Sequence, residues 1–219
     1  KLPGRLTGAA QATDLALTVT QRLRALGVAG EFVEFYGPGL ATLSAGERCV
    51  VANMAPEYGA TTCFFPVDAH TLDYLRATGR SEDHIALVEA YCRHNALWFD
   101  PAAEPRYTQT ITIALDQIGV QVAGPRRPQD LLDHTQTGEA LAKLGFQPNG
   151  KAELPIFPVA LAAITSCTNT SDPGLIIAAG LLARAANARG LKVPAWVKTS
   201  LAPGSPAAAD YLRRCGLDA

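Results

Sequence analysis

Short apolar segments alternate with amphipathic helical patterns along most of this chain, and this alternation constrains its fold more than any other feature. Apolar residues spaced three and four apart, typical of helices with one buried face, occur at residues 12–27. Two further helices are predicted near residues 70–78 and 82–97, the second with a start signal at Ser81. Strand-like composition occurs at residues 31–36, 61–67 and 108–113. Helices and strands in alternation predict an α/β fold, in which helices flank a mixed sheet.

One further helix in the first half carries a clear start signal. Ser44 is followed three residues later by Glu47, the pattern of a capping box. We expect this helix to run toward Met54 and to stop near Pro56, because the residue before a proline disfavours helical geometry.

The second half repeats the alternation. A strand is predicted over 158–164, and a turn over 165–171 leads to a helix from Pro173 to about 188. A strand at 195–198 and a last helix capped by Ser205 follow. Residues 124–156 are rich in glycine, proline and polar residues around one short helical pattern. We therefore predict three parts, namely residues 1–115, a connector at 116–157, and residues 158–219.

Charge and cysteine content exclude several classes of protein. The 219 residues include 19 basic and 20 acidic ones, with no basic tract, so no nucleic-acid partner is expected. No apolar run approaches the roughly 18 residues that span a membrane, so no membrane association is expected. The 5 cysteines are an odd number without a Cys-x-x-Cys pair, which argues against a disulfide framework and favours a cytoplasmic location.

Cys167 has the most reactive predicted setting among the cysteines. It lies in the turn between a strand and a helix N-terminus, where backbone amides and the helix dipole stabilise a thiolate. A metal ligand and a simple buried cysteine are equally compatible with this setting. One cysteine cannot hold an iron–sulfur cluster, and packing roles are expected for Cys49, Cys63, Cys92 and Cys215.

A second candidate site consists of two polar residues, Asn53 and Glu57, which lie four residues apart at a predicted helix end. Residues at this spacing can share one helix face and could bind a substrate hydroxyl or carboxylate. Hydrogen bonds to the local backbone are the alternative role, and the residues alone favour that alternative.

Several long segments resemble the aconitase family. The run from Ile164 to Ser171 is similar to the family segment that supplies the first cluster cysteine, and the run from Ala52 to Thr61 is similar to its Asn-Met motif with a following Glu. Further similar segments are 12–20, 32–37 and 196–205. The resemblance implies layered αβα domains of the aconitase type.

The resemblance also implies a function. The family isomerises citrate to isocitrate through cis-aconitate, with a [4Fe-4S] cluster whose open iron acts as a Lewis acid. By position in the motifs, Cys167 would be one of three cluster ligands. Asn53 and Glu57 would contact the cluster and the substrate hydroxyl.

The chain departs from the family pattern in one important respect. The family's two further cluster cysteines have no counterpart here, so we expect a fragment that covers the second domain and part of the third. We expect this fragment alone to hold no cluster and to be inactive without the remaining domains of its chain. A hydro-lyase of the same family acting on 2-methylaconitate or 2-methylcitrate remains an alternative, and so does an RNA-binding or non-catalytic interaction module.

Overall fold

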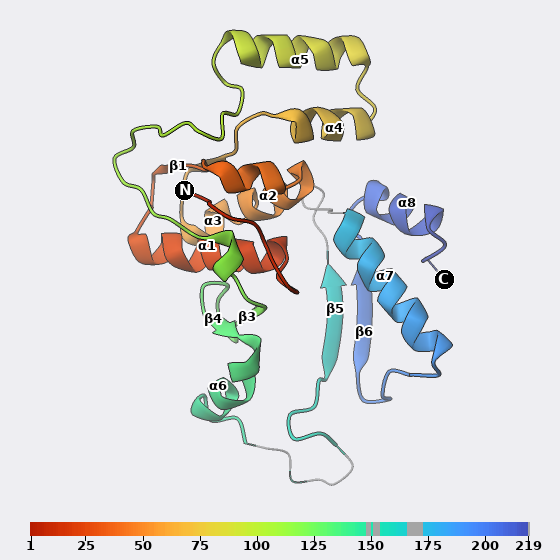
Figure 1. Cartoon of the computed structure of the whole chain (residues 1–219). Coiled ribbons are helices and arrows are strands. Elements are labelled where there is room, and N and C mark those ends of the chain that lie inside the picture. Colours follow the sequence, from red (N-terminus) through yellow and green to blue (C-terminus); the bar gives the residue numbers. More distant parts are fainter. Residues whose placement is uncertain (148–149, 151–153, 166–172, 219) are drawn as a thin grey trace. The chain divides into compact units, whose positions relative to one another are not determined.

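The computed structural model describes residues 1–147, 150, 154–165 and 173–218 of the chain. Its contacts divide the chain into two compact units, Lys1–His134 and Thr135–Ala219. Each unit combines helices with short strands, which confirms the predicted α/β class (Figure 1). The first predicted boundary, near residue 115, falls within the first of these units, and the three-part division stays a prediction.

Helix α1 (Ala12–Leu26) supplies one side of the core of the first unit. Its apolar stripe buries Leu15, Val19 and Leu23, of which the first two are fully shielded from solvent. The Asp14 carboxylate accepts a hydrogen bond from the Gln11 amide (2.8 Å) at the helix start, where a negative charge also suits the helix dipole. The helix predicted at 12–27 is therefore confirmed.

Two short parallel strands, β1 (Phe32–Glu34) and β2 (Thr62–Phe64), pair in register from Phe32 with Thr62 to Glu34 with Phe64. Parallel neighbours need a crossover connection. It is built here from η1 (Pro38–Thr42), α2 (Ala45–Ala52) and α3 (Ala55–Tyr58).

The strand predicted at 108–113 is wrong: the structure has no strand there. This segment lies beside the first residues of the chain instead of joining β1 or β2. The Lys1 carbonyl accepts a hydrogen bond from the Ile113 amide, and the Pro3 carbonyl accepts one from Leu115, both at 2.9 Å. The composition predicted a strand, but the pairing with the first residues of the chain is too short to form one.

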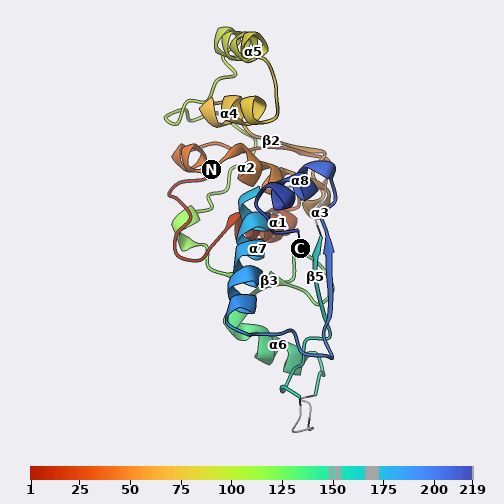
Figure 2. The same ribbon diagram turned by 90° about the vertical axis from the view of Figure 1, so that its right-hand side faces the viewer.

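Helices α4 (Ala69–Ala77) and α5 (Glu82–His94) follow β2 as a helical hairpin, seen one above the other in both views (Figures 1 and 2). A buried ion pair ties this hairpin to α2. Arg48 on α2 donates to the Asp68 carboxylate at 2.5 Å, and Asp68 is the N-cap of α4. Arg48 also donates to the Leu40 carbonyl at 2.7 Å.

The first unit ends with η2 (Leu115–Gln117) and the antiparallel pair β3 (Gln121–Ala123) and β4 (Leu131–Asp133). The Asp14 carboxylate accepts a hydrogen bond from the Gln121 amide at 2.7 Å, so α1 holds β3 directly. Part of the predicted connector is thus packed structure. A short helix, η3 (His134–Gln136), follows β4.

The second unit contains α6 (Thr137–Lys143) and a parallel pair, β5 (Leu161–Thr165) and β6 (Lys198–Ala202), crossed over by α7 (Pro173–Ala188) and followed by α8 (Pro206–Arg214). Helix α7 lies to one side of the strand pair in Figure 2. The Ser205 hydroxyl caps α8 as predicted, accepting from the Ala208 amide at 3.2 Å. The residues of β5 and β6 are exposed along their whole length.

The strand predicted at 195–198 begins later than expected. The Val197 amide donates to the Pro194 carbonyl at 2.9 Å, so a turn occupies this segment and the strand starts at Lys198. None of the helices in the described ranges combines the length and apolar character needed to cross a bilayer.

Candidate active site

The junction between α2 and α3 carries two of the predicted site residues. Helix α2 starts as expected, since the Ser44 hydroxyl accepts from the Glu47 amide and the Glu47 carboxylate accepts from the Ser44 amide at 2.7 Å. The helix ends at Ala52, earlier than predicted. Pro56 does not stop it but lies in the first turn of α3, where a missing amide hydrogen costs nothing.

Asn53 and Glu57 therefore belong to two consecutive helices rather than to one helix end. Asn53 is the C-cap of α2: its backbone amide donates to the Cys49 carbonyl at 3.0 Å. The residue is exposed. Glu57 lies within α3 and is half-buried. Their roles toward a substrate stay predictions.

Glu57 has an unusual environment for a carboxylate. Its Oε2 is buried and accepts no hydrogen bond from the described residues. Burying such an atom without a partner is costly. The next residue, Tyr58, is 1% exposed and holds α3 in the core. Helix α3 therefore holds Glu57 in place with one buried carboxylate oxygen that has no hydrogen-bond partner among the described residues.

Cys167 and residues 166–171 of the turn predicted around it lie outside the described residues, whereas Thr165 is the last residue of β5. Burial raises the pKa of Cys63 to about 11, and burial also raises the pKa of Cys49. Both thiols are therefore protonated at neutral pH and are poor metal ligands. Cys92 is buried, and Cys215 is exposed at the end of α8.

No set of three or more His, Cys, Asp or Glu side chains suited to a metal ion occurs among the residues that the structure describes. These residues thus do not fit an iron–sulfur cluster by themselves, since a cluster needs three or four thiolates.

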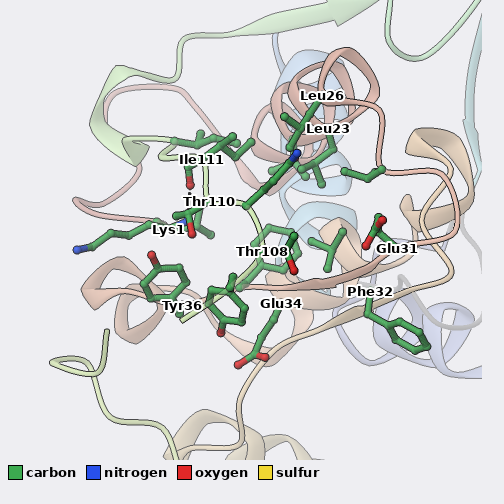
Figure 3. Close-up of a pocket in the computed structure, with 18 of the residues that line it drawn as sticks. Lys1, Leu23, Leu26, Glu31, Phe32, Glu34, Tyr36, Thr108, Thr110 and Ile111 are labelled. Carbon is green, nitrogen blue, oxygen red and sulfur yellow. Dashed lines mark hydrogen bonds between the residues drawn. The ribbon is translucent and has the colours of Figure 1, made fainter. Parts of the chain in front are cut away.

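A cavity of about 240 Å³ lies elsewhere in the first unit (Figure 3). One wall is formed by Glu31–Tyr36, the opposite wall by Tyr107–Ile111, and the floor by apolar residues of α1. Asn53 and Glu57 do not line it. No local sequence pattern indicates this cavity, because its walls come from segments about 75 residues apart that only the fold brings together.

The comparisons with known proteins agree with the resemblance. The family model for the aconitase family (aconitate hydratase) matches residues 1–219. Phosphinomethylmalate isomerase of Streptomyces viridochromogenes is 51% identical over 234 residues, which cover 100% of this chain and 26% of that protein. Aconitate hydratase A of Bacillus subtilis is 49% identical, and that of Escherichia coli 47%, each over 99% of this chain and 26% of the relative.

The chain thus spans about a quarter of the length of these relatives. A match along all of its residues, together with identities near one half, establishes its relationship: the chain belongs to the aconitase family.

Proposed function

We propose that the protein to which this chain belongs is a hydro-lyase that isomerises citrate to isocitrate through cis-aconitate. The observation that carries the proposal is the 49% and 47% identity to two proteins named aconitate hydratase A, over 99% of this chain. Because the chain spans 26% of each relative, the proposed activity is that of the whole protein, and the remaining domains are its proposed partners.

Glu57 is the residue of the described chain that best fits a contact with substrate. Its Oε2, which has no hydrogen-bond partner in the described ranges of the chain, can accept a hydrogen bond from a substrate hydroxyl or from a water that is leaving or adding. Asn53, exposed at the end of α2, can donate through its amide to a substrate carboxylate.

Cys167 is proposed as one of three ligands of a [4Fe-4S] cluster, with two thiolates from parts of the protein outside this sequence. When bound, such a cluster supplies a Lewis acid for a hydroxyl and a carboxylate of the substrate. The proposal for Cys167 rests on its family motif, and a cytoplasmic location is proposed from the cysteine content of the chain.

The role of Glu57 is tested by Glu57→Gln in the natural-length enzyme, with citrate as substrate. We expect the rate to fall about 100-fold or more, because an amide neither binds a proton nor carries the charge of a carboxylate. The matched control is Glu89→Gln on α5, whose partly exposed carboxylate pairs with Arg93 on the same helix, and this change should leave the rate unchanged. An unchanged rate for Glu57→Gln would remove Glu57 from the reaction.

A second candidate substrate is favoured by one specific observation. The relative named phosphinomethylmalate isomerase is 51% identical, slightly more than the two aconitate hydratases. Phosphinomethylmalate, or a close analogue, is therefore a substrate to compare with citrate. A higher kcat/KM with that compound would replace citrate as the proposed substrate.

A further inference from the structure

The cavity of the first unit borders a free edge of β1. On one side of this strand, the Phe35 amide donates to a β2 carbonyl at 2.9 Å. On the other side, the Tyr36 carbonyl accepts from the Leu2 amide at 2.8 Å. Successive residues of a strand direct their backbone groups to alternate sides, so those of Phe32 and Glu34 face the same side as Tyr36. No described residue forms a backbone hydrogen bond with them on that side.

The opposite wall of the cavity already pairs with the first residue of the chain. The Lys1 amine donates to the Ile111 carbonyl at 2.6 Å, and the Lys1 carbonyl accepts from the Ile113 amide at 2.9 Å. This is the pattern of parallel pairing. Lys1 lies at one end of the cavity, and Glu31 and Phe32 lie at the other (Figure 3).

We propose that this cavity holds an extended strand formed by the residues that precede Lys1 in the natural protein, parallel to β1 and bonded to both walls. The hydrogen bonds of Lys1 and Leu2 to the two walls fix the direction of the chain at this point, so the residues before Lys1 would run along the cavity. The relatives, which are about four times as long as this chain, show that the family has further polypeptide to supply it.

The register of this strand follows from the same hydrogen bonds. At about 3.3 Å per residue, about four residues reach from Lys1 to the level of Phe32. In a strand, every second side chain points to the same face, so the first and third residues before Lys1 point to the same face as Leu2. Leu2 is 1% exposed and belongs to the same buried cluster as Val19 and Leu23. Both of these residues should therefore be apolar. A charged residue at either position would overturn the proposal.

Hydrogen exchange of single amides tests the strand directly, in the natural-length protein and in the 219-residue chain. We expect the amides of Glu34 and Ile111 to exchange at least about tenfold more slowly in the natural-length protein, because each gains an acceptor. The Phe35 amide, bonded to β2, is the internal control and should be equally protected in both.

Equal exchange of Glu34 and Ile111 in the two proteins would overturn the proposal. Slower exchange that appears only when citrate is added would also overturn it, and would make the cavity a small-molecule site. Neither result depends on whether the protein is a citrate hydro-lyase, so this inference and the proposed function fail separately.

Discussion

The buried ion pair between Arg48 and Asp68 should be the most sensitive polar contact of the first unit. The two side chains are 4% and 10% exposed and lie 2.5 Å apart. Removing one partner of a buried pair leaves an uncompensated charge and costs about 3–5 kcal/mol. Asp68→Ala also removes the N-cap of α4, which adds about 1 kcal/mol. We therefore expect Asp68→Ala to lower the free energy of unfolding by about 4–6 kcal/mol.

Urea denaturation followed by Trp98 fluorescence measures this loss, in a Trp196→Phe background that leaves one tryptophan in the first unit. Asp68→Asn separates the two contributions, since asparagine keeps a good N-cap but leaves Arg48 unpaired. The control is Glu89→Ala, which breaks an exposed pair on α5 and should cost less than about 0.5 kcal/mol. A loss below about 1 kcal/mol for Asp68→Ala would refute the reasoning.

Three further changes have defined outcomes. Ser44→Ala removes the capping hydroxyl of α2 and should cost about 1 kcal/mol in urea denaturation, and no loss would mean that this cap does not stabilise the fold. Gly39→Ala places a methyl group 2.5 Å from the Leu2 carbonyl oxygen, so a loss of at least about 1–3 kcal/mol is expected, and a neutral result would contradict this close approach. Burial raises the pKa of Cys63 to about 11 from the ordinary 9.0, so its contribution to stability is complete below pH 9 and is lost as the pH rises toward 11. Cys63→Ala should flatten this alkaline decline, measured as the free energy of unfolding against pH, and an identical decline in both proteins would exclude Cys63 as its source.

Local signals along the sequence predicted two helix starts well. Ser44 with Glu47 and Ser205 form the caps that their spacing indicated, because capping depends on residues three positions apart. Pro56 misled the prediction, since a proline is equally suited to the first turn of a new helix.

Contacts between distant segments were beyond reach of the sequence. Residues 108–113 have the composition of a strand, but their partner is the start of the chain, which local patterns do not indicate. The burial of the Glu57 carboxylate oxygen could not be predicted from the sequence either, because it depends on how α3 packs in the core. The motif around Asn53 and Glu57 identified the residues through the family, whereas their environment required the structure.

The most direct test of the proposed hydro-lyase is the activity of the natural-length protein with citrate after anaerobic reconstitution with iron and sulfide, beside its Cys167→Ser and Cys215→Ser variants. We predict that the unaltered protein and Cys215→Ser form isocitrate and show the visible absorption of a cluster, because Cys215 is an exposed thiol at the end of α8. Cys167→Ser should lose both the absorption and the activity. A Cys167→Ser variant that keeps the cluster and converts citrate would contradict the role of Cys167, and an unaltered protein that binds the cluster but leaves citrate unchanged would contradict the proposed reaction.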